Sequence, residues 1–491
     1  MPGAFTLGAE RVRDVAPTSP FPNFHWSTNL LPIHQPTSIR GATVPEHDTD
    51  ATTSPTTTPP SDSRQPSSTM TPLARRTAVA GFVGTVVEYY DFATYGLVAV
   101  ILAPHFFNSD SSATAVLAAL AVFGTAYVAR PVGGLVFGHF GDRYGRRNAL
   151  LATIVLMGIC SVAIGLLPTI DHIGLLAPIL LIGLRLGQGF AAGGELMGAV
   201  AYVLESTPPR KRGLLTSVTQ MGATLGFSIA ALVVGSVTAL TTSEQMSSWG
   251  WRIPFLLCLP LTLLCLRLRL RLEDSPEFTD MVANAEIEKA PLIDALRRHP
   301  GAIAKAAAFT VATTGASHVG LVYMSVLLIG TLGFDAQSIY WMTAVVVAVA
   351  AASTPAWGFV SDRIGRRPVM MIATLGTAAI IYPVLWTMTA TSSIALVGLV
   401  FFVYMIFTQA FAPGLTTVSE LFPRRMRYSG SALGYNAGIV AGGAFAPFMS
   451  AQLVESTGSA LSPAVLVVTV CAIGFLATLT MRETGKSGLA T

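Results

Sequence analysis

The chain has 491 residues, of which 52% are hydrophobic and only 11% are charged. Soluble domains carry about 25% charged residues, so this composition excludes a water-soluble surface and favours one large membrane domain. The net charge of +4 is small, so the placement of the charges along the chain is more informative than their sum.

The first 69 residues are rich in Pro, Ser and Thr, as in the stretch Ala51-Thr-Thr-Ser-Pro-Thr-Thr-Thr-Pro-Pro60. Such a composition cannot bury enough apolar surface to fold, so residues 1–69 are expected to be a disordered tail. The tail has no apolar core of the length found in secretory signal peptides. Met70 directly precedes the first long apolar run, and we expect either that Met70 is the translation start or that the tail is dispensable.

From residue 77 onward, apolar runs of about 20 residues recur, each long enough to cross a hydrocarbon core of about 30 Å. Backbone polar groups in lipid must be satisfied internally, and the runs lack the alternation of barrel strands, so they are predicted to be helices. The sequence predicts twelve spans, at about 78–104, 114–138, 148–167, 174–205, 213–239, 251–272, 302–330, 337–360, 368–388, 393–421, 428–453 and 462–481.

The basic residues occur in every second connector between the predicted spans. Connectors after even-numbered spans hold Arg143, Arg146 and Arg147; Arg210, Lys211 and Arg212; Arg297 and Arg298; Arg363, Arg366 and Arg367; and Arg424, Arg425 and Arg427. Connectors after odd-numbered spans contain no Lys or Arg and carry Asp110, Asp171, Glu244, Asp335 and Glu455. By the positive-inside rule, both termini are expected to be cytoplasmic.

The chain also repeats itself. Gly138-His-Phe-Gly-Asp-Arg-Tyr-Gly-Arg-Arg147 follows span 2, and Gly358-Phe-Val-Ser-Asp-Arg-Ile-Gly-Arg-Arg367 follows span 8, with the aspartates 362 − 142 = 220 residues apart. A weaker echo follows spans 4 and 10, at Glu205 and Glu420. The repeat predicts two homologous six-helix halves, residues 70–272 and 302–482, joined by a cytoplasmic linker at 273–301 and followed by a cytoplasmic tail at 483–491. This is the architecture of a rocking transporter.

The doubled Gly-x-x-x-Asp-Arg-x-Gly-Arg-Arg loop resembles the signature of the major facilitator superfamily. Further segments resemble its metabolite:proton symporter family, which includes carriers of dicarboxylates, tricarboxylates, shikimate and proline or betaine. These segments are Glu88-Tyr-Tyr-Asp-Phe92, Arg130-Pro-Val-Gly-Gly134, Arg185-Leu-Gly-Gln-Gly-Phe-Ala-Ala-Gly-Gly-Glu195, Trp251-Arg-Ile-Pro-Phe255 and Glu273-Asp-Ser-Pro-Glu-Phe278. The resemblance covers about residues 70–485 and implies an all-α membrane protein with twelve transmembrane helices that carries a small metabolite together with protons.

The two loops are the candidate gates. Their members are Gly138, Asp142, Arg143, Gly145, Arg146 and Arg147, and Gly358, Asp362, Arg363, Gly365, Arg366 and Arg367. The glycines allow tight turns and close helix approach, and the aspartates can accept hydrogen bonds at a helix start or pair with an arginine across the halves. The resemblance implies a latch that stabilises the outward-facing state; the alternative is charge that only sets topology.

Glu88 and Asp91 lie inside span 1, where charged side chains are costly and usually functional. They are three residues apart, about 60° around a helix, so both are expected to face a central cavity. Tyr95 lies four residues beyond Asp91 and is expected to hydrogen-bond to it. A carboxylate that alternates between dry surroundings and an arginine can take up and release a proton. The alternative is a static tie between helices.

Arg130 in span 2 and Arg185 in span 4 are the cationic partners available to these carboxylates or to a substrate carboxylate. The resemblance links Arg185 to proton movement. Gln188 and Glu195 are seven residues apart and share one helix face. The glycines of span 4 (Gly187, Gly189, Gly193 and Gly194) are expected to serve packing.

Weaker candidates for the cavity lie in the second half: His318, Gln409, Tyr435 and Asn436. Each of them has an ordinary packing role as its alternative. Arg267, Arg269 and Arg271 approach the end of span 6 and are expected to set topology.

Enzymatic and nucleic-acid functions have no support in the sequence. We find no nucleotide-binding loop, no catalytic triad order and no metal-ligand spacing, so no cofactor or metal is expected. The sequence therefore predicts a monomeric, proton-coupled importer of a small metabolite, most simply an organic acid because two intramembrane arginines need anionic partners. A zwitterionic osmolyte carrier is the alternative, and an exporter or a non-transporting sensor is less favoured.

Overall fold

The computed structural model describes residues 72–107, 112–271, 279 and 291–485. Every regular element in those ranges is a helix. The predicted tail at 1–69 and most of the predicted linker at 273–301 lie outside the described residues, as do residues 486–491 of the predicted C-terminal tail.

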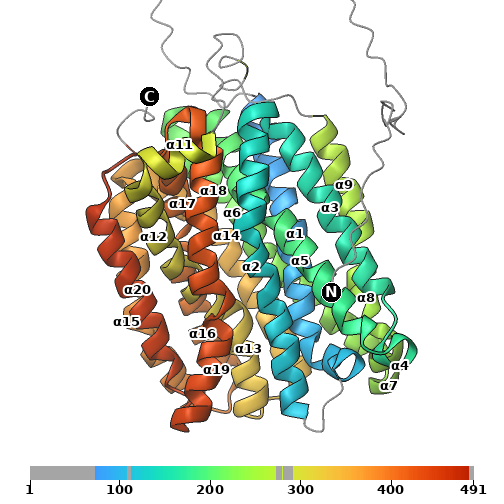
Figure 1. The fold of residues 1–491 in the computed structure, drawn as a ribbon. Helices are drawn as coiled ribbons and strands as arrows, with labels where there is room; N and C mark the ends of the chain where they lie inside the picture. The colour runs from blue at the N-terminus through green and yellow to red at the C-terminus, as the bar shows by residue number, and fades with distance from the viewer. Residues whose placement is uncertain (1–71, 108–111, 272–278, 280–290, 486–491) are drawn as a thin grey trace, which may run out of the picture. The chain divides into compact units, whose positions relative to one another are not determined.

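The first half contains helices α1 to α9 (Figure 1). Its long helices are α1 (Pro72–Phe106), α2 (Ser112–Tyr144), α3 (Arg146–Leu166), α5 (Leu176–Glu205) and α6 (Arg212–Leu240). The sixth span is composed of α7 (Ser243–Gln245), the π-helical turn η2 (Met246–Gly250), α8 (Arg252–Leu256) and α9 (Cys258–Leu270), and the short elements α4 (Ile170–Ile173) and η1 (Pro209–Lys211) lie in connectors.

The second half begins with α11 (Pro291–Arg298) and continues to α20. Its seventh span is built from α12 (Pro300–His318), η3 (Val319–Tyr323), α13 (Met324–Val326) and η4 (Leu327–Thr331). The later spans are α14 (Ala336–Ile364), α15 (Arg366–Ala390), α16 (Ile394–Gln409) with α17 (Ala412–Glu420), α18 (Arg427–Ile439) with η6 (Val440–Ala444) and α19 (Ala446–Thr457), and α20 (Pro463–Thr480), with η5 (Arg424–Met426) before α18.

The helices agree with the predicted spans in number and order. Among the described residues, 11 helical segments are long and apolar enough to cross a membrane, and the 35-residue helix α1 occupies the position of the remaining span. The predicted ends were wrong where the repeated loops begin: α2 continues to Tyr144 rather than ending at 138, and α14 continues to Ile364 rather than 360. The extra turns carry Asp142 and Asp362 to the other half, as described below.

The two halves meet along two helix pairs. Helix α6 packs along α14, and α2 packs along α18, the latter pair standing side by side in Figure 1. The connectors rich in arginine, together with α11, lie at one end of the bundle, at the top of the view, which we call the Arg-rich end. Helices α4 and α7 lie at the opposite end. There Asp335 accepts a hydrogen bond from the Ser338 backbone N–H at 2.8 Å and caps α14, which holds the pKa of this carboxyl below its usual range.

Helices α2 and α5 approach so closely that their backbones touch. A Cβ atom added at Gly189 would lie 1.7 Å from the Ala126 carbonyl oxygen, and one at Gly193 would lie 2.1 Å from that of Arg130. The same holds in the other direction, because a Cβ at Gly133 would lie 1.7 Å from the Phe190 carbonyl oxygen. The predicted packing role of the span 4 glycines is therefore confirmed, and it brings Arg130 close to α5.

We predict that Gly189→Ala destabilises the protein by about 1–3 kcal/mol, because the new methyl group must push α2 and α5 apart. The matched control is Gly183→Ala on the same helix, where a Cβ atom meets nothing within 4 Å. Thermal unfolding in detergent measures both variants. Equal melting temperatures for the two variants would contradict the packing described here.

Candidate functional site

At the Arg-rich end, Asp142 of α2 binds the first turn of α18 in the other half. Its Oδ2 accepts hydrogen bonds from the Ser429 backbone N–H at 2.9 Å and from the Ser429 hydroxyl at 2.5 Å. Arg146 pairs with Asp142 and, at 3.1 Å, with Glu205. A carboxylate at a helix N-terminus is stabilised by the unpaired N–H groups and by the helix dipole. We call this arrangement the first latch.

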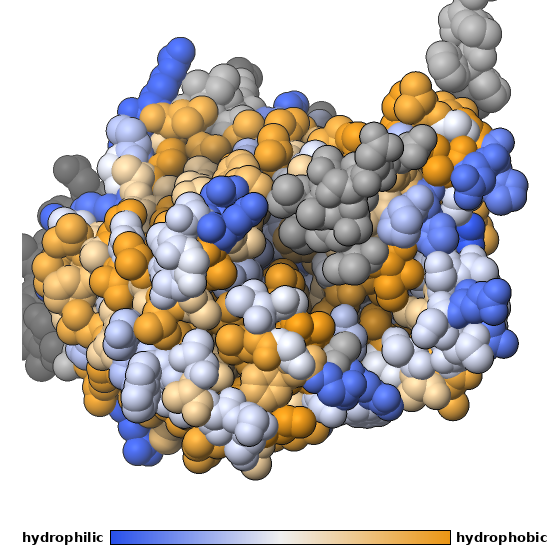
Figure 2. Space-filling view, turned by 90° about the horizontal axis from the view of Figure 1, so that it is seen from below, coloured by the Kyte–Doolittle hydropathy of each residue, from blue (hydrophilic) through white to orange (hydrophobic). Residues whose placement is uncertain are grey.

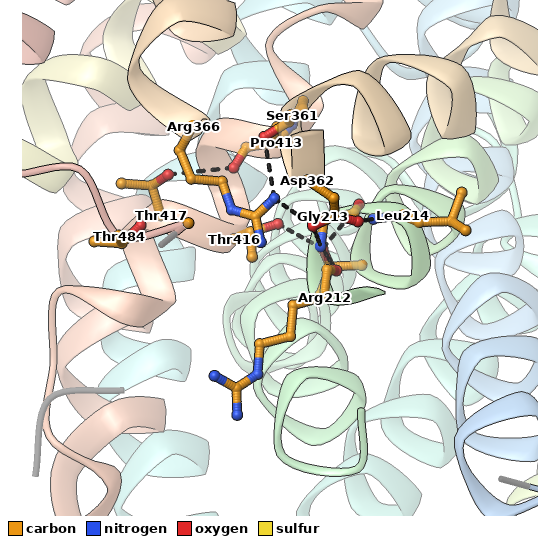
Figure 3. A network of polar contacts seen from close by, with 12 residues as sticks. Arg212, Gly213, Leu214, Ser361, Asp362, Arg366, Pro413, Thr416, Thr417 and Thr484 are labelled. Carbon is orange, nitrogen blue, oxygen red and sulfur yellow. Dashed lines mark hydrogen bonds and ion pairs between the residues drawn. The ribbon is translucent and has the colours of Figure 1, made fainter. Parts of the chain in front are cut away.

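The second latch repeats these contacts in the other direction (Figure 3). Asp362 of α14 accepts hydrogen bonds from the backbone N–H groups of Gly213 at 2.9 Å and Leu214 at 2.8 Å, in the first turn of α6. Arg366 pairs with Asp362 at 2.7 Å and approaches Glu420 at 3.6 Å. Both predicted aspartates therefore accept hydrogen bonds at a helix start, and charge that only sets topology does not account for these contacts.

The glycines of the two loops have two different roles. Gly145 and Gly365 have φ angles of 104° and 107° and join consecutive helices. Gly138 and Gly358 lie within α2 and α14, where the absence of a side chain lets the other half approach. A Cβ at Gly358 would lie 2.4 Å from the Gly213 carbonyl oxygen.

The remaining arginines of the loops lie outside the latches. Arg143 and Arg363 are exposed and lie over aromatic rings of their own helices. Arg147 donates to the Leu270 carbonyl at 3.0 Å, and Arg367 donates to that of Leu479 at 2.8 Å. These contacts hold α3 to α9 and α15 to α20 within each half.

We predict that Asp142→Asn leaves folding largely intact and slows transport. Loss of charge-assisted hydrogen bonds worth about 1–3 kcal/mol shifts the balance between closed and open states roughly 5- to 150-fold. Uptake rate and melting temperature are measured together. The matched control is Arg143→Gln, which removes an exposed charge from the same turn; wild-type uptake by Asp142→Asn would contradict a gating role.

Between the two ends, Glu88 of α1 and Arg130 of α2 form a fully buried ion pair. Arg130 Nη2 lies 2.9 Å from Glu88 Oε1, and the guanidinium faces the rings of Phe92 at 4.4 Å and Tyr127 at 5.0 Å. Glu88 Oε2 and Arg130 Nε and Nη1 have no hydrogen-bond partner among the described residues. The pair therefore has both an acceptor and donors left over for another group.

Asp91 is connected to Arg185 through Gln188. Gln188 donates to Asp91 Oδ2 at 2.5 Å and accepts from Arg185 Nη1 at 2.9 Å. The thiol of Cys258 lies 3.7 Å from Asp91 Oδ1. The predicted hydrogen bond between Asp91 and Tyr95 was wrong: the Tyr95 hydroxyl donates to a backbone carbonyl at 3.3 Å, and its ring stacks on Arg185 at 4.3 Å.

Glu88 and Asp91 were predicted to face one central cavity together. In the structure they do not share one face. The angular offset between them turns Glu88 toward α2 and Asp91 toward α5 and α9. Neither carboxylate is in the lining of the two cavities described below.

Glu195 of α5 also forms a buried ion pair, with Arg269 of α9. Arg269 donates to both carboxylate oxygens, and Thr153 adds a hydrogen bond at 2.6 Å. Arg269 also donates to the Leu150 carbonyl at 2.6 Å, so the pair is well saturated. The topology role predicted for Arg269 was wrong, although Arg267 and Arg271 are exposed as expected. Residues two apart lie about 200° around a helix, which is the signal that could have separated Arg269 from its neighbours.

Gln188 and Glu195 share one face of α5, as predicted. Gln188 contacts the Ser161 hydroxyl at 3.0 Å, and Glu195 contacts Thr153, and both of these hydroxyl residues belong to α3.

We predict that Glu195→Gln lowers stability by about 3–5 kcal/mol, because it leaves the Arg269 charge buried without a counter-charge. The double variant Glu195→Leu with Arg269→Leu is expected to recover most of this loss, and Arg271→Gln serves as the exposed control. Thermal unfolding in detergent checks all three. A Glu195→Gln protein that melts like the wild type but loses its response to a pH gradient would instead place Glu195 in the coupling machinery.

The second-half candidates all reach the first half. His318 Nδ1 lies 2.8 Å from the Thr314 carbonyl, which can only accept, so Nδ1 carries the proton and Nε2 accepts from the Tyr127 hydroxyl at 3.0 Å. The Tyr435 and Tyr89 hydroxyls are hydrogen-bonded at 3.0 Å. Two side chains of the predicted set thus meet the aromatic residues that surround Arg130.

Gln409 and Asn436 make the other two connections. Gln409 Oε1 accepts from Thr224 of the first half and from Thr354 of its own half, each at 2.9 Å. Asn436 Nδ2 donates to the Gly193 carbonyl of α5 at 2.7 Å. The bonds of Gln409 to Thr224 and of Asn436 to Gly193 must change if the halves move, because each of these two joins one half to the other.

Among the described residues, a polar cavity and an apolar cavity lie between the halves. The polar cavity has a volume of about 30 Å³ and is lined mostly by hydroxyl and amide side chains: Tyr89, Gln220, Ala223, Thr224, Thr313, Thr314, Ser317, His318, Leu321, Thr408, Gln409 and Tyr435. The apolar cavity has a volume of about 230 Å³ and is lined by Ala93, Gly96, Leu97, Phe123, Phe227, Leu321, Val322, Ser325, Val326, Ile329, Gly330 and Tyr340. Gln220 and the threonines of this set were missed by the sequence analysis, since such residues are common in apolar helices.

The apolar cavity lies farther from the Arg-rich end than the polar cavity does. Along α1, which begins at the Arg-rich end, the polar cavity is reached at Tyr89 and the apolar cavity at Ala93 to Leu97. Figure 2 views the opposite end of the molecule and shows it hollowed near its centre, with hydrophobic residues on the rim.

The comparisons with known proteins agree with this arrangement. A family model described as "Sugar (and other) transporter" matches residues 77–316 and 302–490. The chain belongs to this transporter family of the major facilitator superfamily. A shikimate transporter of Escherichia coli (strain K12) is 35% identical over 422 residues, covering 84% of this chain and 96% of the relative. A proline/betaine transporter of Salmonella typhimurium is 32% identical over 432 residues, covering 84% and 85%.

This chain shares its fold with a solved structure, that of the proton:xylose symporter XylE bound to 6-bromo-6-deoxy-D-glucose. It has a TM-score of 0.70 at 19% identity and covers 84% of this chain and 97% of that chain. At this identity the likeness shows the fold alone. The chain is thus a multi-pass membrane transporter rather than an enzyme, and the predicted twelve-helix fold is confirmed.

Proposed function

We propose that this chain is a proton-coupled secondary transporter that moves a small carboxylate-bearing metabolite into the cell by alternating access. The observation that carries the proposal is the buried pair of Glu88 and Arg130, which keeps unpartnered polar atoms on both sides. Buried charges are tolerated where they are paired and hydrogen-bonded, and unused donors in such a site favour an anionic ligand. The organic-acid proposal is also supported by the similarity to a shikimate transporter.

The pair suggests how a proton and an anion can be coupled. One guanidinium, Arg130, faces one protein carboxylate, Glu88. When Glu88 takes a proton it becomes neutral, its hold on Arg130 weakens, and the guanidinium can bind a substrate carboxylate. Asp91 is the alternative proton carrier, and its oxygens are already contacted by Gln188 and Cys258.

The proposed orientation places the Arg-rich end and both termini in the cytoplasm, because basic connectors remain on that side of the cytoplasmic membrane. Both latches are formed at this end and the apolar cavity lies toward the other, which supports the proposal that this is an outward-facing state. We propose that a monomer suffices, since one chain supplies both walls of each cavity.

A zwitterionic osmolyte carrier is the second candidate, and it is favoured by the similarity to proline/betaine transporters. Uptake of labelled shikimate, proline and betaine into proteoliposomes, driven by an imposed pH gradient, separates the candidates. Accumulation of shikimate alone supports the organic-acid carrier, accumulation of proline or betaine supports the osmolyte carrier, and accumulation without any response to the pH gradient would refute proton coupling.

We predict that replacing the carboxylate that carries the proton abolishes substrate accumulation driven by the pH gradient. Exchange of substrate across the membrane is expected to remain. Glu88→Gln and Asp91→Asn are tested separately, because a neutral amide can bind but cannot shuttle a proton. The control is Glu244→Gln, which removes an exposed carboxylate at the opposite end. If both variants fail to fold, the two carboxylates serve as static ties; if both retain full accumulation, neither carries the proton.

A further inference from the structure

The apolar cavity is lined mostly by hydrocarbon side chains, which do not suit strongly hydrated solutes. Its walls are formed by α1, α2 and α6 of the first half and by the seventh span and α14 of the second. Phe123, Phe227, Val322, Val326 and Ile329 line it. One of its few hydroxyls, that of Ser325, is hydrogen-bonded to Thr343 at 3.3 Å. The cavity therefore offers hydrocarbon surface and few polar groups.

The apolar and polar cavities adjoin. Leu321 lines both of them. The Phe227 ring lies 6.0 Å from that of Tyr89 and 6.3 Å from that of His318, and both of these residues line the polar cavity. Leu321 and Phe227 thus form a thin partition between an apolar compartment and a compartment rich in hydroxyl and amide groups.

The apolar cavity lies between the halves, because both halves contribute its lining. Its walls include α2 and α6, the helices of the first half that pack against α18 and α14 of the second. An apolar cavity of about 150 Å³ in a soluble protein stays dry and binds benzene, so a volume of about 230 Å³ accommodates a substituted six-membered ring. Burial of such a ring is favourable by roughly 25 cal/mol per Å² of apolar surface.

We propose that the apolar cavity is the subsite for the hydrocarbon ring of the ligand, whose carboxylate and other polar groups enter the polar cavity. The Tyr89 ring that lines the polar cavity also lies 5.8 Å from the Arg130 guanidinium, so the anionic end approaches the positive charge already described. The inference rests on the proposed function and narrows its substrate class to ring-bearing carboxylic acids.

The test is equilibrium binding of radiolabelled benzoate to the full chain in lipid nanodiscs, without any ion gradient. Benzoate is expected to bind saturably, cyclohexanecarboxylate to compete with it, and acetate, which lacks a ring, to compete at least tenfold more weakly. Val326→Trp fills the cavity from a position that is 42% exposed and should weaken benzoate binding at least tenfold. Val345→Trp, at a position that is 61% exposed and outside the cavity lining, is the matched control.

The proposal is overturned if benzoate does not bind, if acetate competes as well as cyclohexanecarboxylate does, or if Val326→Trp and Val345→Trp bind alike. Binding in detergent that disappears in nanodiscs would show that lipid chains occupy the cavity and would also overturn it. Because no gradient is used, these results are independent of the uptake assays. Gradient-driven uptake without ring binding refutes only the subsite, and ring binding without gradient-driven uptake refutes only the proposed coupling.

Discussion

Each half of this transporter places an aspartate on the first turn of a helix that belongs to the other half, and the closed Arg-rich end depends on this contact. Asp142 and Asp362 are held by backbone N–H groups and by Arg146 and Arg366. Such contacts combine a helix dipole with charge-assisted hydrogen bonds between side chains that are almost fully buried.

Two buried ion pairs of the first half, Glu195–Arg269 and Glu88–Arg130, differ in how completely they are satisfied. Arg269 uses both oxygens of Glu195 and a backbone carbonyl, which makes a rigid tie between helices. Arg130 makes one contact with Glu88 and leaves two of its nitrogens without a partner among the described residues. In a dry interior an unsatisfied donor is costly. We therefore interpret the incomplete pair as the ligand-responsive one and the complete pair as scaffold.

The sequence was informative where a pattern repeats or where a charge is out of place. The twelve spans, the doubled loops and the role of Asp142 and Asp362 as acceptors at a helix start all followed from it. The sequence did not predict correctly which neighbours individual side chains contact. Tyr95 was expected to bond to Asp91, and Arg269 was expected to set topology, because spacing along a helix gives the angle between two side chains and does not identify their neighbours. Tyr127 carried no signal, since a tyrosine in an apolar helix is common.

By itself, the sequence determined the number and order of the membrane-spanning helices and the repeat of the two loops, because hydropathy and repeats are properties of the chain alone. Only the tertiary structure decided which charges are partners, that Gln188 stands between Asp91 and Arg185, and that an apolar cavity adjoins a polar one. The physical reason is that pairing and cavity shape depend on contacts between helices far apart in the sequence. The packing of both halves determines those contacts.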